Sequence, residues 1–384
     1  MSRTDRPIYL DYNATTPHDP EVVEAMRPYL ESEYGNPSSS HVYGTEPRRA
    51  VARARNEVAT LLHARSDEIL FTSGGTESNN YAIIGAARAR SHQGSHIITS
   101  VVEHPAVANT CDWLEREGFS VTRIPVDRHG LVDPKDVQRA IRPETILVTV
   151  MHANNEIGTI EPIREIAAIT AAAGAIMHTD AAQSLGKIPV DVEELGVDLL
   201  TIAGHKLYAP KGVGALYVRS GIRLEPLMHG GSQEGGRRPG TENTLEIVGL
   251  GTACRIAARD LAANQDRMRL TRDRLHDTLS ATGEVRLNGH PDRRLPNTLN
   301  VSFRDVASNE LIEALSQRVA VSAGSACHAD SVTLSPVIRA IGTPLEWGRG
   351  TIRFSTGKLT TMEEVDQAGQ AIIDAWLPLR NHRP

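Results

Sequence analysis

The feature that most constrains the fold is an alternation of short apolar runs and alanine-rich helical stretches between about residue 47 and residue 258. The apolar runs are nearly continuous, as strands buried on both faces require. A polar or glycine-containing turn and a helical stretch follow each run, an order typical of repeated βα units around a mostly parallel sheet. The predicted strands are 68–72, 96–100, 120–125, 146–151, 175–179, 199–203 and 214–218.

The pattern changes after residue 251. Residues 253–279 have helical periodicity over one long stretch, and short strand signals at 300–303 and 351–354 then mix with helical stretches at 309–317 and 362–377. With 384 residues the chain is long enough for more than one domain. We therefore predict an α/β fold whose mostly parallel central sheet carries helices on both faces, in a large domain of residues 15–258. Residues 1–14 and 259–384 would form a smaller α+β domain.

Charge and cysteine content exclude several classes of protein. The chain has 41 basic and 47 acidic residues, a net charge of −6, so no broad basic surface for direct nucleic-acid binding is expected. Only Cys111, Cys254 and Cys327 occur, without a CxxC pair, which argues against a disulfide framework or a cysteine-rich metal site. The N-terminus lacks an apolar signal core, and no apolar run approaches membrane-spanning length. We expect a cytoplasmic protein without a metal and without a membrane contact.

Polar residues follow the ends of the predicted strands. After the first strand comes Ser73-Gly74-Gly75-Thr76, where two glycines and the start of a helix could hold a phosphate. The glycine spacing of dinucleotide and P-loop sites is absent from the chain. Further polar residues at later strand ends are His104, Asn155, Asp180, Gln183, His205 and Lys206. Because ligands of open parallel sheets bind beyond the carboxyl ends of the strands, we expect these residues to converge.

This set has a specific chemical meaning. Pyridoxal 5'-phosphate needs a lysine that forms an imine, a carboxylate beside the pyridine nitrogen, an aromatic ring partner and a phosphate site. Asp180 suits the carboxylate role, because a buried carboxylate favours the protonated ring nitrogen. Lys206 follows a strand and a glycine, from where its amine can reach the cofactor aldehyde.

At this level of detail the chain resembles the cysteine desulfurases, pyridoxal-phosphate enzymes of the class V aminotransferase family with aminotransferase fold type I. The resemblance runs from about residue 8 to about residue 360. Its motifs, in order, are 9–17, 72–79, 152–158, 180–184, 204–206 and 238–243.

The resemblance implies a role for each matching residue. Lys206 is then the Schiff-base lysine, Asp180 the partner of the pyridine nitrogen, and Gln183 a hydrogen-bond donor to the phenolate oxygen of the cofactor. His104 stacks on the ring and moves protons on its sulfur side. The phosphate positions are Gly75, Thr76 and His205, together with Thr241 of a neighbouring subunit, which implies a homodimer with shared active sites. Asn155 and Arg353 match residues that hold the substrate amino acid.

One position departs from the family pattern. Ala203 stands where many members carry a hydroxyl residue, so one phosphate hydrogen bond fewer is expected.

Cys327 is the candidate nucleophile. It lies in a segment rich in small residues, about 322–335, which we interpret as a mobile loop with a reactive thiol. Cys111 and Cys254 lie among helical residues and are interpreted as core side chains. In the long-loop subgroup that the segment resembles, this cysteine takes sulfur from L-cysteine, leaving L-alanine, and passes it from a persulfide to an acceptor protein. His328 or the cofactor site could lower the pKa of the thiol.

Other functions stay open at this stage. A selenocysteine lyase is the first alternative, because residues 327–330 resemble that subgroup. An aminotransferase has no need of a loop cysteine, and a non-catalytic sulfur-relay scaffold has no need of the cofactor residues. The sequence also leaves open the acceptor, which could serve iron-sulfur cluster assembly, tRNA thiolation or DNA phosphorothioate modification.

Overall fold

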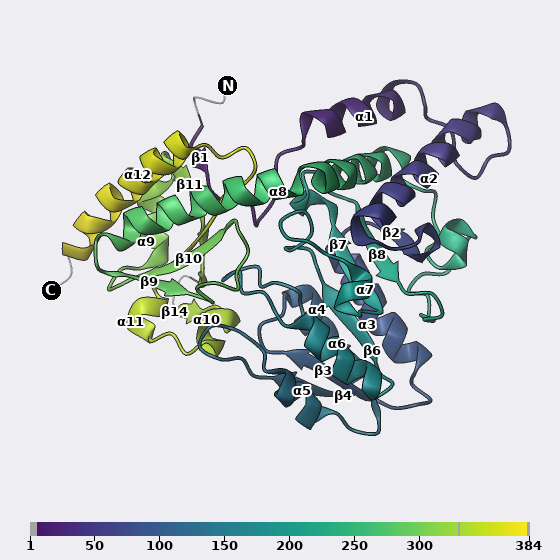
Figure 1. Ribbon diagram of the computed structural model, residues 1–384, viewed down its shortest axis with the longest axis horizontal. Coiled ribbons are helices and arrows are strands. Elements are labelled where there is room, and N and C mark those ends of the chain that lie inside the picture. The colour runs from purple at the N-terminus through teal and green to yellow at the C-terminus, as the bar shows by residue number, and fades with distance from the viewer. Residues whose placement is uncertain (1–5, 329–330, 382–384) are drawn as a thin grey trace.

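A seven-stranded sheet forms the centre of the larger part of the computed structural model (Figure 1). The structure describes residues 6–328 and 331–381, with the backbone alone for 325–328, 331–333 and 381. The strand order is β2-β8-β7-β6-β5-β3-β4; β8 runs antiparallel to both of its neighbours, and the other strands all run in the same direction. The strands are β2 (Ile69–Thr72), β3 (His96–Ser100), β4 (Ser120–Ile124), β5 (Thr145–Thr149), β6 (Ile176–Asp180), β7 (Leu199–Ala203) and β8 (Gly214–Val218). The mostly parallel sheet predicted from the sequence is confirmed, and each predicted strand end lies within two residues of the observed one.

Helices cover both faces of this sheet, which explains the continuous apolar runs. Leu147 of β5 and Ile97 of β3 face a cluster shared with α3 (Gly75–Ala89) and α4 (Pro105–Arg116). Their neighbours Val148 and Ile98 face the opposite cluster. That second cluster receives side chains from α2 (Val42–Leu62), α6 (Ile163–Ala172) and α8 (Thr244–Ser280). Shorter helices of this part are α1 (Pro20–Glu31), α5 (Pro134–Ala140) and α7 (Val192–Leu195).

A four-stranded antiparallel sheet, of order β12-β15-β10-β9, lies beside the larger part, together with α9 and α12 (Figure 1). Phe303 and Trp376 pack in its core with ring centroids 5.3 Å apart. The N-terminal strand β1 (Ile8–Tyr9) joins this region by pairing with β11 (Val319–Ala320). The remaining elements are β9 (Val285–Asn288), β10 (Thr298–Phe303), α9 (Ser308–Leu315), β12 (Ser322–Ala323), β13 (Ser325–His328), β14 (Ser331–Leu334), α10 (Pro336–Ala340), α11 (Leu345–Gly348), β15 (Thr351–Ser355) and α12 (Met362–Asn381).

Helix α8 connects the two regions. Its first half contributes Leu250 to the core beside the large sheet, and its second half contributes Leu275 to the core of the smaller region. The helix begins nine residues before the predicted start and includes Gly249 and Gly251, which pack closely against neighbouring residues. A Cβ at Gly251 would lie 2.5 Å from the Cα of Ala54 on α2. The predicted boundary at residue 258 falls within α8, and the division into two domains stays a prediction.

Within the described residues, no helix is both long and apolar enough to cross a membrane.

Candidate active site

Lys206 lies in a short helical turn, η3 (Gly204–Lys206), directly after β7. Its Nζ donates hydrogen bonds to the carbonyl oxygens of Asn13 and Ala14, the second at 2.8 Å. Burial and, after it, the nearby charge of Arg353 lower the pKa of this amine to about 8, against the opposing effects of Asp11 and Asp180. With this pKa, a fraction of the lysine is the neutral, nucleophilic amine near neutral pH.

Asp180 ends β6 and is only 5% exposed. One carboxylate oxygen, Oδ2, accepts a hydrogen bond from Asn79 Nδ2 at 2.7 Å, and Oδ1 accepts one from the Ala182 amide at 2.9 Å. Among the residues that the structure describes, no cationic side chain pairs directly with this carboxylate. A buried carboxylate that is oriented but has no direct cation suits a positively charged ligand atom such as a protonated pyridine nitrogen.

Helix α3 begins at Gly75, directly after Gly74, within the segment where the sequence predicts a phosphate site. Gly74 caps the helix at φ +148°, a conformation that favours glycine, and Gly75 packs so closely that a Cβ there would lie 3.1 Å from that of Ala203. The free amides and dipole of a helix N-terminus attract anions. His205 accompanies them, with Nδ1 3.2 Å from Thr15 Oγ1. Burial and the neighbouring Lys206 lower the pKa of His205 to about 4, so it is a neutral hydrogen-bonding group.

His104 caps the N-terminus of α4. Its Nδ1 accepts a hydrogen bond from the Ala106 amide at 3.1 Å, so the neutral ring carries its proton on Nε2. Burial lowers the pKa of His104, against the effect of Asp180 and together with that of Lys206. The side chain remains exposed and, with Thr76, lines a hollow of about 370 Å³ between α3 and α4. His104, Asp180 and Lys206 therefore interact electrostatically, as expected for one site.

Gln183 belongs to a buried polar network that the sequence did not indicate. Its Nε2 donates to the carbonyl oxygen of Asn13 at 3.0 Å, and its Oε1 accepts from Lys187 Nζ at 2.8 Å. The Asn13 carbonyl thus holds both Gln183 and Lys206. Asn13 lies in the motif at 9–17, which was the available signal, but nothing in the sequence linked it to Lys187.

Arg353 of β15 is almost completely enclosed. Its Nη2 pairs with Asp11 Oδ1 at 2.8 Å, and its Nη1 donates to the backbone carbonyl of Asn155 at 3.0 Å. Nε is buried and, among the described residues, has no hydrogen-bond acceptor. The structure therefore brings the two predicted substrate residues together, with Asn155 contributing its backbone and Asp11 as an additional partner. An unsatisfied guanidinium donor is suited to binding a carboxylate.

The segment that contains Cys327, about residues 322–335, is hydrogen-bonded at each end to a carboxylate. Ser322 Oγ donates to Asp11 Oδ1 at 2.8 Å, and Ser335 Oγ donates to Glu156 Oε2 at 2.6 Å. Between them, the segment expected to be a loop contains an antiparallel hairpin of β13 and β14, in which Cys327 is paired with Val332. The side chains of Cys327 and His328 lie outside the described residues.

The other two cysteines are buried in α4 and α8 without exposed surface, as predicted. Burial raises the pKa of Cys111 to about 12 and also raises that of Cys254, so neither forms a thiolate readily. Thr241 is exposed between η4 (Gln233–Gly236) and α8, and within the described part of the chain it makes no hydrogen bond to the other predicted site residues. No group of three or more described His, Cys, Asp or Glu residues could hold a metal ion.

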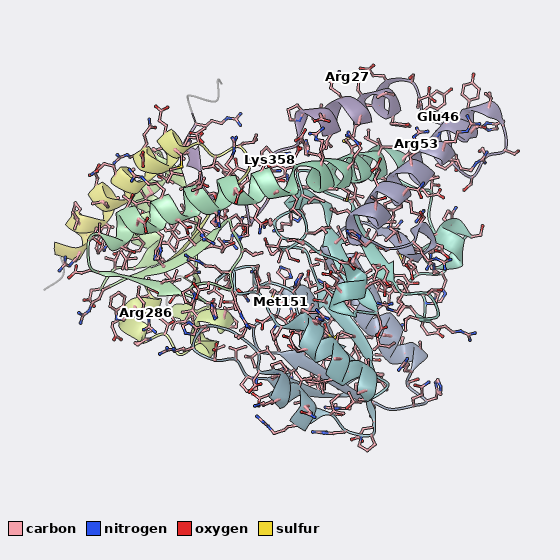
Figure 2. All side chains as sticks on the ribbon, in the orientation of Figure 1. Arg27, Glu46, Arg53, Met151, Arg286 and Lys358 are labelled. Atoms are coloured by element: carbon pink, nitrogen blue, oxygen red, sulfur yellow. The ribbon has the colours of Figure 1, made fainter. Side chains whose placement is uncertain are left out.

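Glu103 is a further buried acid beside the site. Its Oε1 accepts hydrogen bonds from Ser100 Oγ at 2.7 Å and from the Met151 amide at 3.0 Å. Met151 lies near the middle of the molecule (Figure 2). Burial raises the pKa of Glu103 to about 8, so the acid is largely protonated at neutral pH. It ties the ends of β3 and β5 together next to His104.

Known proteins are similar to this chain over nearly its whole length. The family model described as Aminotransferase class-V matches residues 8–368. A relative named cysteine desulfurase IscS, from Dictyoglomus turgidum, is 50% identical over 363 residues, which cover 94% of this chain and 92% of the relative. A solved structure titled NifS-like protein has a TM-score of 0.91 at 37% identity and covers 96% of this chain and 98% of its own. A second, titled SspA in complex with cysteine, has a TM-score of 0.81 at 39% identity and covers 92% and 99%. The resemblance drawn from the motifs is confirmed.

Proposed function

The chain belongs to the aminotransferase class-V family, and from this premise we propose that it is a pyridoxal-phosphate-dependent cysteine desulfurase. It removes sulfur from L-cysteine, releases L-alanine and holds the sulfur as a persulfide on Cys327 before passing it to an acceptor protein. Relatives that carry the desulfurase name over nearly the whole chain support this function. The main structural support is that three groups lie close enough to interact electrostatically. They are the Lys206 amine, whose pKa is lowered, the buried carboxylate of Asp180 and the guanidinium of Arg353.

The residues of the site fit pyridoxal 5'-phosphate. When bound, this cofactor supplies an aldehyde for the lysine and a ring that withdraws electrons from the substrate. Lys206 would join the aldehyde, Asp180 would hold the ring nitrogen protonated, and His104 would stack on the ring. The phosphate would bind at Gly75, Thr76 and His205, the positions at and beside the N-terminus of α3.

Proton movement falls to Lys206 and His104. With a pKa of about 8, the freed Lys206 amine is partly neutral at physiological pH and removes the Cα proton of the substrate as a general base. The Nε2–H of the neutral His104 ring is available on the sulfur side. The two groups therefore divide the proton transfers between the Cα atom and the sulfur atom.

Arg353 binds the substrate carboxylate. Its unsatisfied Nε supports this role, as does the neighbouring Asn155 carbonyl, which fixes the guanidinium. The substrate carboxylate meets Asp11 as a competitor for Nη2. The arginine that would bind L-cysteine therefore also donates a hydrogen bond to Ser322, at the start of the segment that contains Cys327.

Cys327 accepts the sulfur. Its thiolate forms a bond to the substrate sulfur while the substrate carbon–sulfur bond breaks, and the bonding electron pair stays with the carbon that becomes the methyl group of alanine. The buried state and raised pKa of Cys111 and Cys254 support the assignment to Cys327.

A homodimer with shared active sites accompanies this function. The exposed Thr241 is available to a second subunit. An exposed apolar surface between α1 and α2 supports a protein contact: Leu30 is 75% exposed and Tyr34 78%, and Tyr34 stacks on Tyr43 with ring centroids 5.9 Å apart. Such a surface is typical of interfaces in oligomers.

A visible spectrum during titration with L-cysteine tests the proposal. Wild-type protein should be yellow and should release alanine and, with a reductant, sulfide. Lys206→Ala should shift or lose the absorbance band, and Cys327→Ser should abolish sulfide release while keeping the band. A colourless wild type that cannot be reconstituted with the cofactor would contradict the proposal, and the same assay with selenocysteine measures the preference between the two substrates.

A further inference from the structure

Lys187 is a lysine in an unusual environment. It is only 5% exposed, and its Nζ donates to Gln183 Oε1 at 2.8 Å and to Asn13 Oδ1 at 3.1 Å. Within the described residues, no carboxylate pairs with it. A buried amine without an anionic partner costs stability, so a hydrophobic residue at this position would favour folding.

The hydrogen bonds of Lys187 determine how two amides are oriented. The Lys187 amine donates both of these hydrogen bonds, so it faces the oxygen end of each amide. The nitrogen end of Asn13 then donates to Thr298 Oγ1 at 2.8 Å. The nitrogen end of Gln183 donates one hydrogen to the Asn13 carbonyl and keeps its second hydrogen for another acceptor. Lys206 is held by the same carbonyl, so the network reaches the reactive amine.

We infer that Lys187 is a positioning residue, which fixes the Gln183 amide so that its free N–H faces the cofactor oxygen and keeps Asn13 in place for Lys206. This inference rests on the proposed function. Without the amine, the Asn13 carbonyl alone holds the Gln183 amide, so the orientation is less firmly fixed and the amide oxygen can turn toward the negatively charged phenolate. On this account, the protein retains a buried lysine that lowers its stability because that lysine orients the active-site amide.

Charged groups around Lys187 bear on any test that uses pH. Lys206 and Arg353 both face it and lower its pKa, in addition to burial. Lys206 in turn faces Arg353, Asp11 and Asp180, and its charge also acts on His104. A variant must therefore be compared with wild type across the same pH range, because these neighbours titrate in both proteins.

The test uses Lys187→Met, which keeps the unbranched shape of the side chain, shortens it by one atom and removes its donors. Loss of the Gln183 hydrogen bond leaves more negative charge on the phenolate, so the pH at which the visible band of the bound cofactor changes should rise by about 0.5 to 1 unit, the size of one hydrogen bond. The kcat for L-cysteine should fall about threefold to tenfold with a nearly constant KM, because Lys187 makes none of the hydrogen bonds that hold Arg353. Lys135→Met, on the exposed surface of α5, is the matched control and should leave both values unchanged.

A double mutant separates positioning from structural support. In a Gln183→Leu background, Lys187→Met should shift the band by less than about 0.2 unit, because the amide through which it acts is gone. Unchanged pH dependence and kcat in the single variant, with only a lower melting temperature, would overturn the inference. So would an undiminished shift in the Gln183→Leu background.

A crystal structure of the wild-type holoenzyme gives a second measurement if Lys187→Met fails to fold. Lys187 Nζ should remain within hydrogen-bond distance of Gln183, and Gln183 should contact the cofactor oxygen. Separation of either pair refutes the positioning role. Alanine production by the wild type is measured independently, so failure of this inference is distinguishable from failure of the proposed function.

Discussion

Replacing Lys206 by Met should change how the stability of the cofactor-free protein depends on pH. In the folded protein the pKa of Lys206 is about 8, against 10.5 for an ordinary lysine. Below pH 8 the amine is charged in both folded and unfolded chains, and the full cost of burying the charge is present. Between pH 8 and 10.5 the unfolded chain binds more protons than the folded chain, so the stability of the wild type rises with pH.

The size of this effect follows from the two pKa values. At about 1.36 kcal/mol per pH unit, the wild type should gain about 2 kcal/mol relative to Lys206→Met between pH 7.5 and 9.5. The lost hydrogen bonds to Asn13 and Ala14 add a pH-independent offset that cancels in this comparison. Urea unfolding of both proteins at several pH values measures the difference. A stability difference that does not change with pH would refute the account of a desolvated amine.

Three further substitutions test other contacts of the site. Asp11→Asn removes the carboxylate that competes for Arg353 and should lower the KM for L-cysteine about fivefold in steady-state assays. The reason is that a charge-assisted hydrogen bond of about 1.5 kcal/mol is weakened. An unchanged or higher KM would contradict the competition. Asn79→Leu removes a donor to Asp180 and should reduce kcat about tenfold and weaken cofactor retention during dialysis, whereas wild-type retention would argue against an orienting role. The free energy of unfolding of Glu103→Gln, measured with urea, should rise by about 3 kcal/mol relative to that of the wild type between pH 5 and 7.5. The folded wild type keeps a proton up to about pH 8 that its unfolded chain releases near pH 4.5. A difference that stays constant with pH would count against this.

The sequence allowed prediction of the central sheet because burial on both faces leaves a strong signal in each strand. The same reasoning placed Lys206 and Asp180 correctly at strand ends, since the carboxyl ends of parallel strands meet at one edge. It missed the beginning of α8, where Gly249 and Gly251 permit close helix packing that no local pattern reveals.

The polar network behind the site could not be predicted from local pattern. Asp11 and Arg353 are separated by 342 positions, and their pairing depends on how the N-terminal segment lies across the smaller sheet. Lys187 resembles a surface lysine that follows a glycine, and only the folded chain shows it buried between two amides. The small residues around Cys327 suggested a mobile loop, and nothing in the sequence indicated that its backbone pairs as a hairpin, because that pairing depends on register.

The most direct test of the account is the mass of the peptide that contains Cys327, measured after the holoenzyme has reacted with L-cysteine without reductant and has been alkylated. The account predicts an added sulfur atom on this peptide, and predicts that the addition is absent from Lys206→Ala and from peptides with Cys111 or Cys254. Alanine formation by the wild type with unmodified Cys327, or the added sulfur on another cysteine, would contradict it.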